Sequence, residues 1–113
     1  MAKLIVIALL ALIAVLLWRN WSRSRREAYI TAFPYQRFLD QRLAARHPGL
    51  TAEQRNEVFA ALDDYFQFCR KAGRRMVSMP SQAVDDAWHE FILFTRQYDK
   101  FCRHAFGRFL HHT

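Results

Sequence analysis

The chain has 113 residues, with 17 Lys or Arg against 10 Asp or Glu, and its formal net charge is +7. This length excludes a multidomain enzyme, because one domain takes roughly 100–200 residues. Five basic residues and no acidic residue precede position 27, so residues 27–113 carry 12 basic and 10 acidic residues. That near balance makes nucleic-acid binding the least favoured class. With only 3 Gly and 3 Pro, a turn-rich β-sandwich is disfavoured too.

The chain begins with an apolar run of 15 residues from Leu4 to Trp18. A helix of this length spans roughly 22 Å, and it approaches the thickness of the hydrocarbon core if Lys3 extends toward the interface. Trp18 and Trp21 are typical of the aromatic belt at a membrane surface. A cleaved signal peptide is the alternative, but the bulky, basic sequence after the run contains no small-residue cleavage site. The sequence therefore predicts an uncleaved anchor over residues 1–26.

Charges on the two sides of this run predict the orientation of the chain. One lysine precedes the run and four arginines follow it within eight residues. By the positive-inside rule, we expect a single-pass membrane protein with a short N-terminus outside and the following domain in the cytoplasm. Basic residues at this depth also attract anionic headgroups, although a stop-transfer flank alone accounts for them. These four residues are Arg19, Arg23, Arg25 and Arg26.

Two helices are predicted in the first half of the soluble part, which we take as residues 27–113. The first covers residues 34–47, because a proline fits its first turn and a His-Pro pair ends it. The second covers residues 51–73, where Thr51 and Gln54 have the spacing of a capping box and a glycine follows the helix. Basic residues near its end complement the helix dipole, which we favour over a phosphate-binding site.

The second half is predicted to contain a loop at residues 76–81 and one or two further helices. Ser81 suits the N-cap of a helix that carries Trp88. The last helical segment, which ends at Gly107, is either continuous with that helix or separated from it by a break near Arg96. No alternating strand pattern occurs in the sequence. We therefore expect an all-α fold, in which a single transmembrane helix is followed by a small bundle of three to five short helices.

Polar side chains interrupt an apolar helix most densely at residues 85–91, with the sequence DDAWHEF. Asp85 and His89 are four residues apart, so their side chains meet on one helix face. There a carboxylate can orient an imidazole, or both groups can bind one metal ion. Trp88 borders the same face, whereas Glu90 lies about 100° around the helix and is expected in solvent.

Further potential metal ligands follow. Tyr98 and Cys102 are again four residues apart, and a turn at Gly107 would bring a terminal histidine back to the first pair. Zinc or another divalent metal suits such a set, whose members are Asp85, His89, Cys102, His111 and His112. The alternative is a buried hydrogen bond between Asp85 and His89 that only stabilises the helices. We expect Cys69 and Cys102 to be free, buried thiols in a reducing cytosol.

One pattern of rare residues runs through residues 76–113. It reads D-x-x-W-H…Y-x-x-x-C…G…H, and its members are Asp85, Trp88, His89, Tyr98, Cys102, Gly107 and His111 or His112. This pattern resembles the helical domain of the plant glycine-rich-domain proteins and their bacterial relatives. The resemblance implies a helical domain and strengthens the case for a site at Asp85, His89 and a terminal histidine. It implies no particular reaction.

The sequence is compatible with two functions. The favoured one is a non-enzymatic, membrane-anchored helical module that binds a protein partner at the cytoplasmic membrane face. The alternative is a metal- or His-dependent enzyme, in which His89 is ligand or base and Asp85 orients it. Cys102 or a C-terminal histidine, His111 or His112, would be a further ligand. No Ser-His-Asp order, phosphate loop or haem motif points to another reaction. The residues of the candidate site are Asp85, Trp88, His89, Tyr98 and Cys102.

Overall fold

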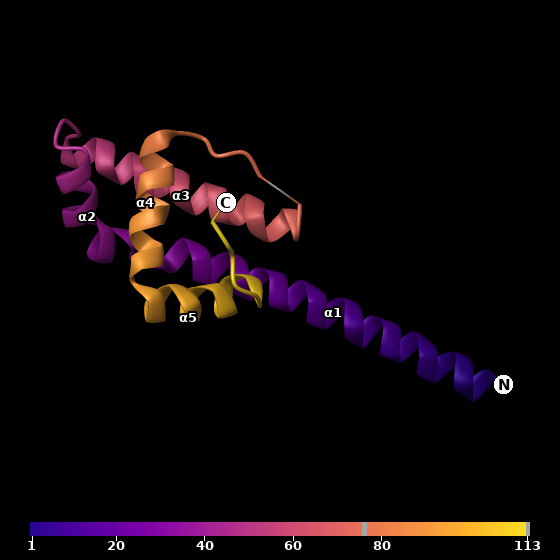
Figure 1. Ribbon diagram of the computed structural model, residues 1–113. Coiled ribbons are helices and arrows are strands. Elements are labelled where there is room, and N and C mark those ends of the chain that lie inside the picture. The colour runs from indigo at the N-terminus through magenta and orange to yellow at the C-terminus, as the bar shows by residue number, and fades with distance from the viewer. Residues whose placement is uncertain (76, 113) are drawn as a thin grey trace.

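The computed structural model describes residues 1–75 and 77–112, and these ranges form five helices without any strand (Figure 1). The helices are α1 (Ala2–Ala32), α2 (Tyr35–Arg46), α3 (Ala52–Ala72), α4 (Gln82–Leu93) and α5 (Thr95–Phe106). The predicted all-α class is confirmed, with one long apolar helix at the N-terminus and a small helical bundle after it.

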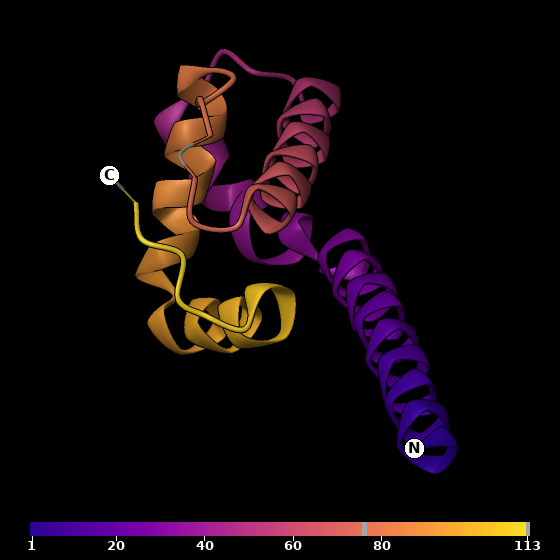
Figure 2. The same ribbon diagram turned by 90° about the vertical axis from the view of Figure 1, so that its right-hand side faces the viewer.

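The helix α1 is unbroken over 31 residues, which corresponds to about 46 Å. By length and composition it can cross a membrane, since an 18-residue window has a mean hydropathy of 2.4 and is not buried in the protein. Its last turns belong to the bundle, where Ile30 is fully buried and where α3 and α5 pack against the helix. Figure 2 shows the remainder of α1 projecting away from the other helices. A single helix therefore joins the apolar segment to the bundle.

Short sequence signals set the ends of the other helices. The hydroxyl of Thr51 accepts a hydrogen bond from the backbone N–H of Gln54, whose side chain accepts one from the Thr51 N–H. The predicted capping box is thus confirmed, and Ser81 caps α4 in the same way through its hydroxyl. The break between α4 and α5 lies at Phe94, two residues before the predicted position at Arg96.

Aromatic side chains form much of the core. Phe66, Phe91 and Phe101 are fully buried, and the ring centroid of Phe101 lies 5.1 Å from that of each of the other two. Tilted pairs of this kind contribute about 0.5–1.5 kcal/mol beyond the buried area. Such pairs help a small bundle to bury enough surface for a stable fold.

The loop between α3 and α4 and the two cysteines complete the core. Val77 and Met79 pack against it from the loop, whereas Met76 lies outside the described residues. Cys69 and Cys102 are buried free thiols. Burial raises the pKa of both thiols, so they remain protonated and unreactive near neutral pH.

Candidate functional site

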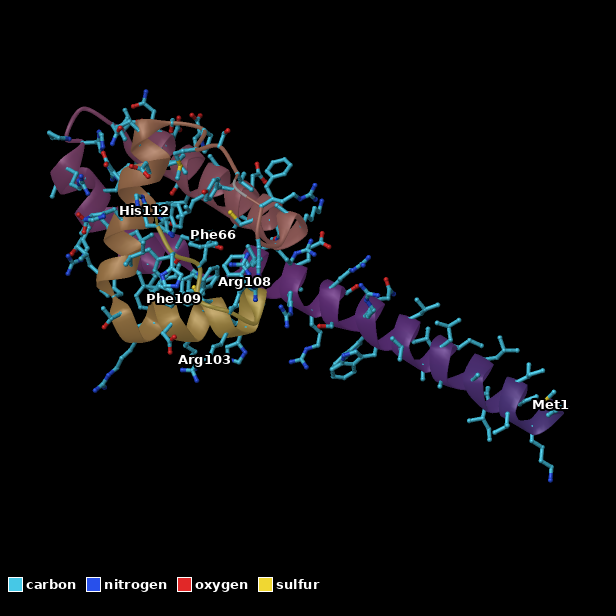
Figure 3. The ribbon with its side chains drawn as sticks, turned by 45° about the vertical axis from the view of Figure 1, so that its right-hand side comes forward. Met1, Phe66, Arg103, Arg108, Phe109 and His112 are labelled. Atoms are coloured by element: carbon cyan, nitrogen blue, oxygen red, sulfur yellow. The ribbon has the colours of Figure 1, made fainter. Side chains whose placement is uncertain are left out.

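The C-terminal tail turns back onto α4 after the end of α5. Gly107 has a φ of 71°, in the left-handed region that glycine adopts without strain. His112 Nε2 then lies 2.6 Å from Asp85 Oδ1, and its ring centroid is 4.5 Å from that of Trp88. Figure 3 shows His112 in this position beside α4. The expected approach of a terminal histidine to Asp85 is confirmed.

His89 does not occupy the predicted position. Its side chain is exposed, and within the described part of the chain no hydrogen bond joins it to Asp85. The His89 ring centroid is 6.1 Å from that of His112, and it is His112 that binds the Asp85 carboxylate. Asp85 therefore pairs with the tail and not with its neighbour on the same helix.

Trp88 and Tyr98 form structural hydrogen bonds that the sequence pattern did not predict. The indole N–H of Trp88 donates to the Tyr98 hydroxyl at 2.9 Å, and that hydroxyl donates to the Leu110 carbonyl at 2.5 Å. Burial raises the pKa of the Tyr98 phenol, so the hydroxyl keeps its proton and can donate it. These two buried hydrogen bonds hold the tail against α4 and α5.

The predicted metal ligands do not converge. Over residues 1–75 and 77–112, no group of three or more His, Cys, Asp or Glu side chains could hold a metal ion. Cys102 is fully buried in the core, and the ring of His111 lies against that of Phe109 with centroids 4.7 Å apart. The prediction of a zinc site therefore has no support in the described residues.

An ionic network joins α2 to α4. Asp86 Oδ2 lies 2.6 Å from His47 Nε2, and Asp86 Oδ1 lies 3.1 Å from a guanidinium nitrogen of Arg46. Glu90 pairs with Arg42 and Arg46, each at 3.5 Å. The expectation that Glu90 lies in solvent is wrong, because its residue surface is only 9% exposed beneath α2.

The environment of Asp86 keeps its carboxylate charged. Burial alone would raise its pKa, but hydrogen bonds from His47 and Gln82 and the charge of Arg46 outweigh this effect and lower the pKa. A signal for this network is present in the sequence. Basic residues of α2 and acidic residues of α4 each recur four residues apart, so two complementary helix faces can meet.

A pocket of about 190 Å³ lies where the end of α3, α4 and the tail meet. Its buried lining includes Tyr65, Cys69 and Trp88, and its more accessible lining includes Arg74, Arg75, Arg108 and His111. A guanidinium N–H of Arg108 donates to the Gly73 carbonyl, which ties the tail to the end of α3. Among the described residues no acidic side chain lines this pocket. Its chemistry therefore suits a negatively charged group beside an apolar wall.

Comparison with known proteins assigns most of the chain to one family. Residues 25–113 match the family model described as UCP032817-like. No curated protein and no solved structure matches the chain. The resemblance to plant glycine-rich-domain proteins is wrong, because a different family model matches and spans the residues that suggested it. The residues behind that resemblance have a physical explanation instead, since Trp88, Tyr98 and Cys102 are core and tail contacts.

Proposed function

The chain belongs to the UCP032817-like family, and we propose that it is a membrane-anchored helical binding module. The strongest support for an anchored module is that α1 is one unbroken helix from Ala2 to Ala32. Its N-terminal part is long and apolar enough to cross a membrane, and its last turns are packed into the bundle. A bundle attached in this way stays within a short distance of the bilayer and meets partners there.

The proposal divides the chain into an anchor with a basic flank, residues 1–26, and a helical domain, residues 27–113. It places the short N-terminus outside and the domain in the cytoplasm, because the basic residues follow the apolar run. The enzyme alternative has less support. His89 is exposed and is not bonded to Asp85, and the described residues bring no third ligating group to the pair of Asp85 and His112.

The pocket beside Trp88 is the surface that we propose for recognition. Arg74, Arg75 and Arg108 line it together with the aromatic rings of Tyr65 and Trp88. Arginine binds carboxylates through paired hydrogen bonds, and aromatic side chains contribute strongly at protein interfaces. The proposed partner is accordingly a protein that presents an acidic side chain next to an apolar one.

Photo-crosslinking in cells tests this proposal. A benzoylphenylalanine at position 111, which lines the pocket, is expected to give a discrete protein adduct. The same probe at Arg37, an exposed residue of α2, serves as the control. Adding Arg74→Glu to the position-111 probe is expected to reduce the adduct at least severalfold, because it reverses a charge at the pocket. Equal adducts at both positions, or an adduct insensitive to Arg74→Glu, would contradict a binding role for the pocket.

A further inference from the structure

Two grooves flank α1 at the point where it leaves the apolar segment. One lies between α1 and the C-terminal end of α3, and its lining includes Trp18, Arg19, Arg23, Arg26, Arg70 and Lys71. The other lies between α1 and the C-terminal part of α5, and its lining includes Trp18, Trp21, Arg25, Arg26, Arg103 and His104. In Figure 1, α3 and α5 both run toward the side from which α1 projects.

Both grooves carry an excess of positive charge. The α3 groove is lined by five cations and one carboxylate, that of Glu27, which lies 3.9 Å from Arg70. No acidic residue of the described chain lines the α5 groove, where Arg103 pairs with the neighbouring Asp99 at 2.8 Å. Most of these cations are arginines of residues 19–26, and Arg70, Lys71 and Arg103 of residues 27–113 add to them. Together they form a basic side of the bundle where α1 leaves it.

The helix dipoles of α3 and α5 account for part of this pattern. Their C-terminal ends carry partial negative charge, which favours nearby cations such as Lys71 and Arg103. They do not account for Arg19 and Arg23, which belong to the middle of α1 and are far from either end of that helix. Cations from two helices therefore converge on one groove, and Glu27 offsets only part of their charge, so a further anion would reduce their mutual repulsion.

The depth of the grooves identifies the anion. The apolar run that ends at Trp18 is about 22 Å long. Tryptophan favours the membrane–water interface, so we place Trp18 near the surface of the hydrocarbon core. The next eight residues, 19–26, rise by about 12 Å, which reaches through the headgroup layer. Trp18 lines both grooves, so both open at this level. The phosphates of lipid headgroups occupy the same depth.

We propose that the two grooves bind the phosphate groups of anionic phospholipids in the leaflet next to the bundle. Bound lipids would bridge α1 to the ends of α3 and α5 and hold the bundle against the membrane surface. This site is separate from the pocket beside Trp88. The inference rests on α1 spanning the bilayer, as proposed above, and incorporation of the chain into a bilayer tests that premise by itself.

The test uses the full chain in nanodiscs of phosphatidylcholine and phosphatidylglycerol, with bromine on the acyl chains of one lipid or the other. Bromine quenches tryptophan fluorescence, and Trp18 lies in both grooves. The relative quenching by the two lipids gives the preference for the anionic one. We expect the wild type to prefer phosphatidylglycerol, and Lys71→Glu to reduce that preference about fivefold or more, since each basic residue near the surface contributes about 1 kcal/mol.

Arg37→Glu provides the matched control, because Arg37 is also an exposed cation on a helix but lines neither groove. We expect it to leave the lipid preference unchanged. A preference that persists in Lys71→Glu, or falls equally in both variants, would overturn the groove as the binding site. Both variants are compared only at equal melting temperature, and Lys71→Gln replaces Lys71→Glu if the reversal unfolds the chain.

Inorganic phosphate distinguishes a lipid headgroup from a soluble ligand of the same chemistry. It is added to the wild-type nanodiscs at the ionic strength of a chloride control, so that both samples have the same screening. We expect no greater loss of the preference with phosphate than with chloride. Specific displacement by phosphate would assign the grooves to a soluble anion and overturn the lipid proposal.

Discussion

Replacement of Phe66 by alanine is expected to lower the free energy of unfolding of the bundle by about 3–5 kcal/mol. Phe66 is fully buried, and its ring lies near rings of α2, α4 and α5, with centroid distances from 5.1 Å to 6.2 Å. Alanine would leave a cavity that no single helix can close, because four helices share this contact. Denaturant titration of the full chain in micelles, followed by near-UV circular dichroism, measures the loss.

Phe68 provides the control on the same helix. Its residue surface is 60% exposed, so Phe68→Ala is expected to change the free energy of unfolding by less than about 0.5 kcal/mol. A small effect at Phe66, or a similar effect at both positions, would contradict the way in which α3 faces the core.

Replacement of Asp86 by alanine is expected to cost about 1.5–3 kcal/mol of unfolding free energy. Asp86 connects α2 to α4, because its carboxylate binds both His47 and Arg46 and is itself buried. Its removal leaves the half-buried His47 without its acceptor. Asp99→Ala is the control, since Asp99 pairs with Arg103 on an exposed turn of α5 and such pairs contribute only about 0.3–0.5 kcal/mol. Equal losses in the two variants would contradict the network.

The lowered pKa of Asp86 also predicts that the stability of the bundle depends on pH. The pKa of this carboxyl group is lowered in the folded state by His47, Gln82 and Arg46 against the effect of burial. The contribution of such a group is fully present above the unfolded pKa of about 3.9, and it is lost as the pH falls through the folded pKa. Stability of the wild type is therefore expected to fall more steeply below about pH 4 than that of Asp86→Asn. Parallel acid titrations of the two proteins measure the difference, and identical curves would contradict it.

Local sequence signals predicted most of the fold. The capping box at Thr51, the cap at Ser81 and the long apolar N-terminal run each depend on neighbouring residues, so they could be read without the structure. The all-helical class followed from these signals together with the spacing of apolar residues. The turn at Gly107 was visible for the same reason, because a left-handed backbone favours glycine.

Contacts between distant segments do not follow from such local signals. Asp85 had two possible partners, His89 on its own helix and a histidine at the end of the chain, and only the folded tail decides between them. Glu90 was misplaced because its burial depends on arginines of α2, about 45 residues earlier. The basic side of the bundle was missed because net charge does not record where cations from α1, α3 and α5 converge.

Labelling of an introduced cysteine in oriented vesicles measures directly on which side of the membrane the bundle lies. Arg37→Cys places a thiol on an exposed position of α2, outside both grooves, whereas the native Cys69 and Cys102 are buried and provide a low background. A membrane-impermeant maleimide is expected to label this cysteine in inside-out vesicles and to leave it unlabelled in right-side-out vesicles. Labelling in right-side-out vesicles would place the bundle outside the cell and contradict a cytoplasmic, membrane-anchored module.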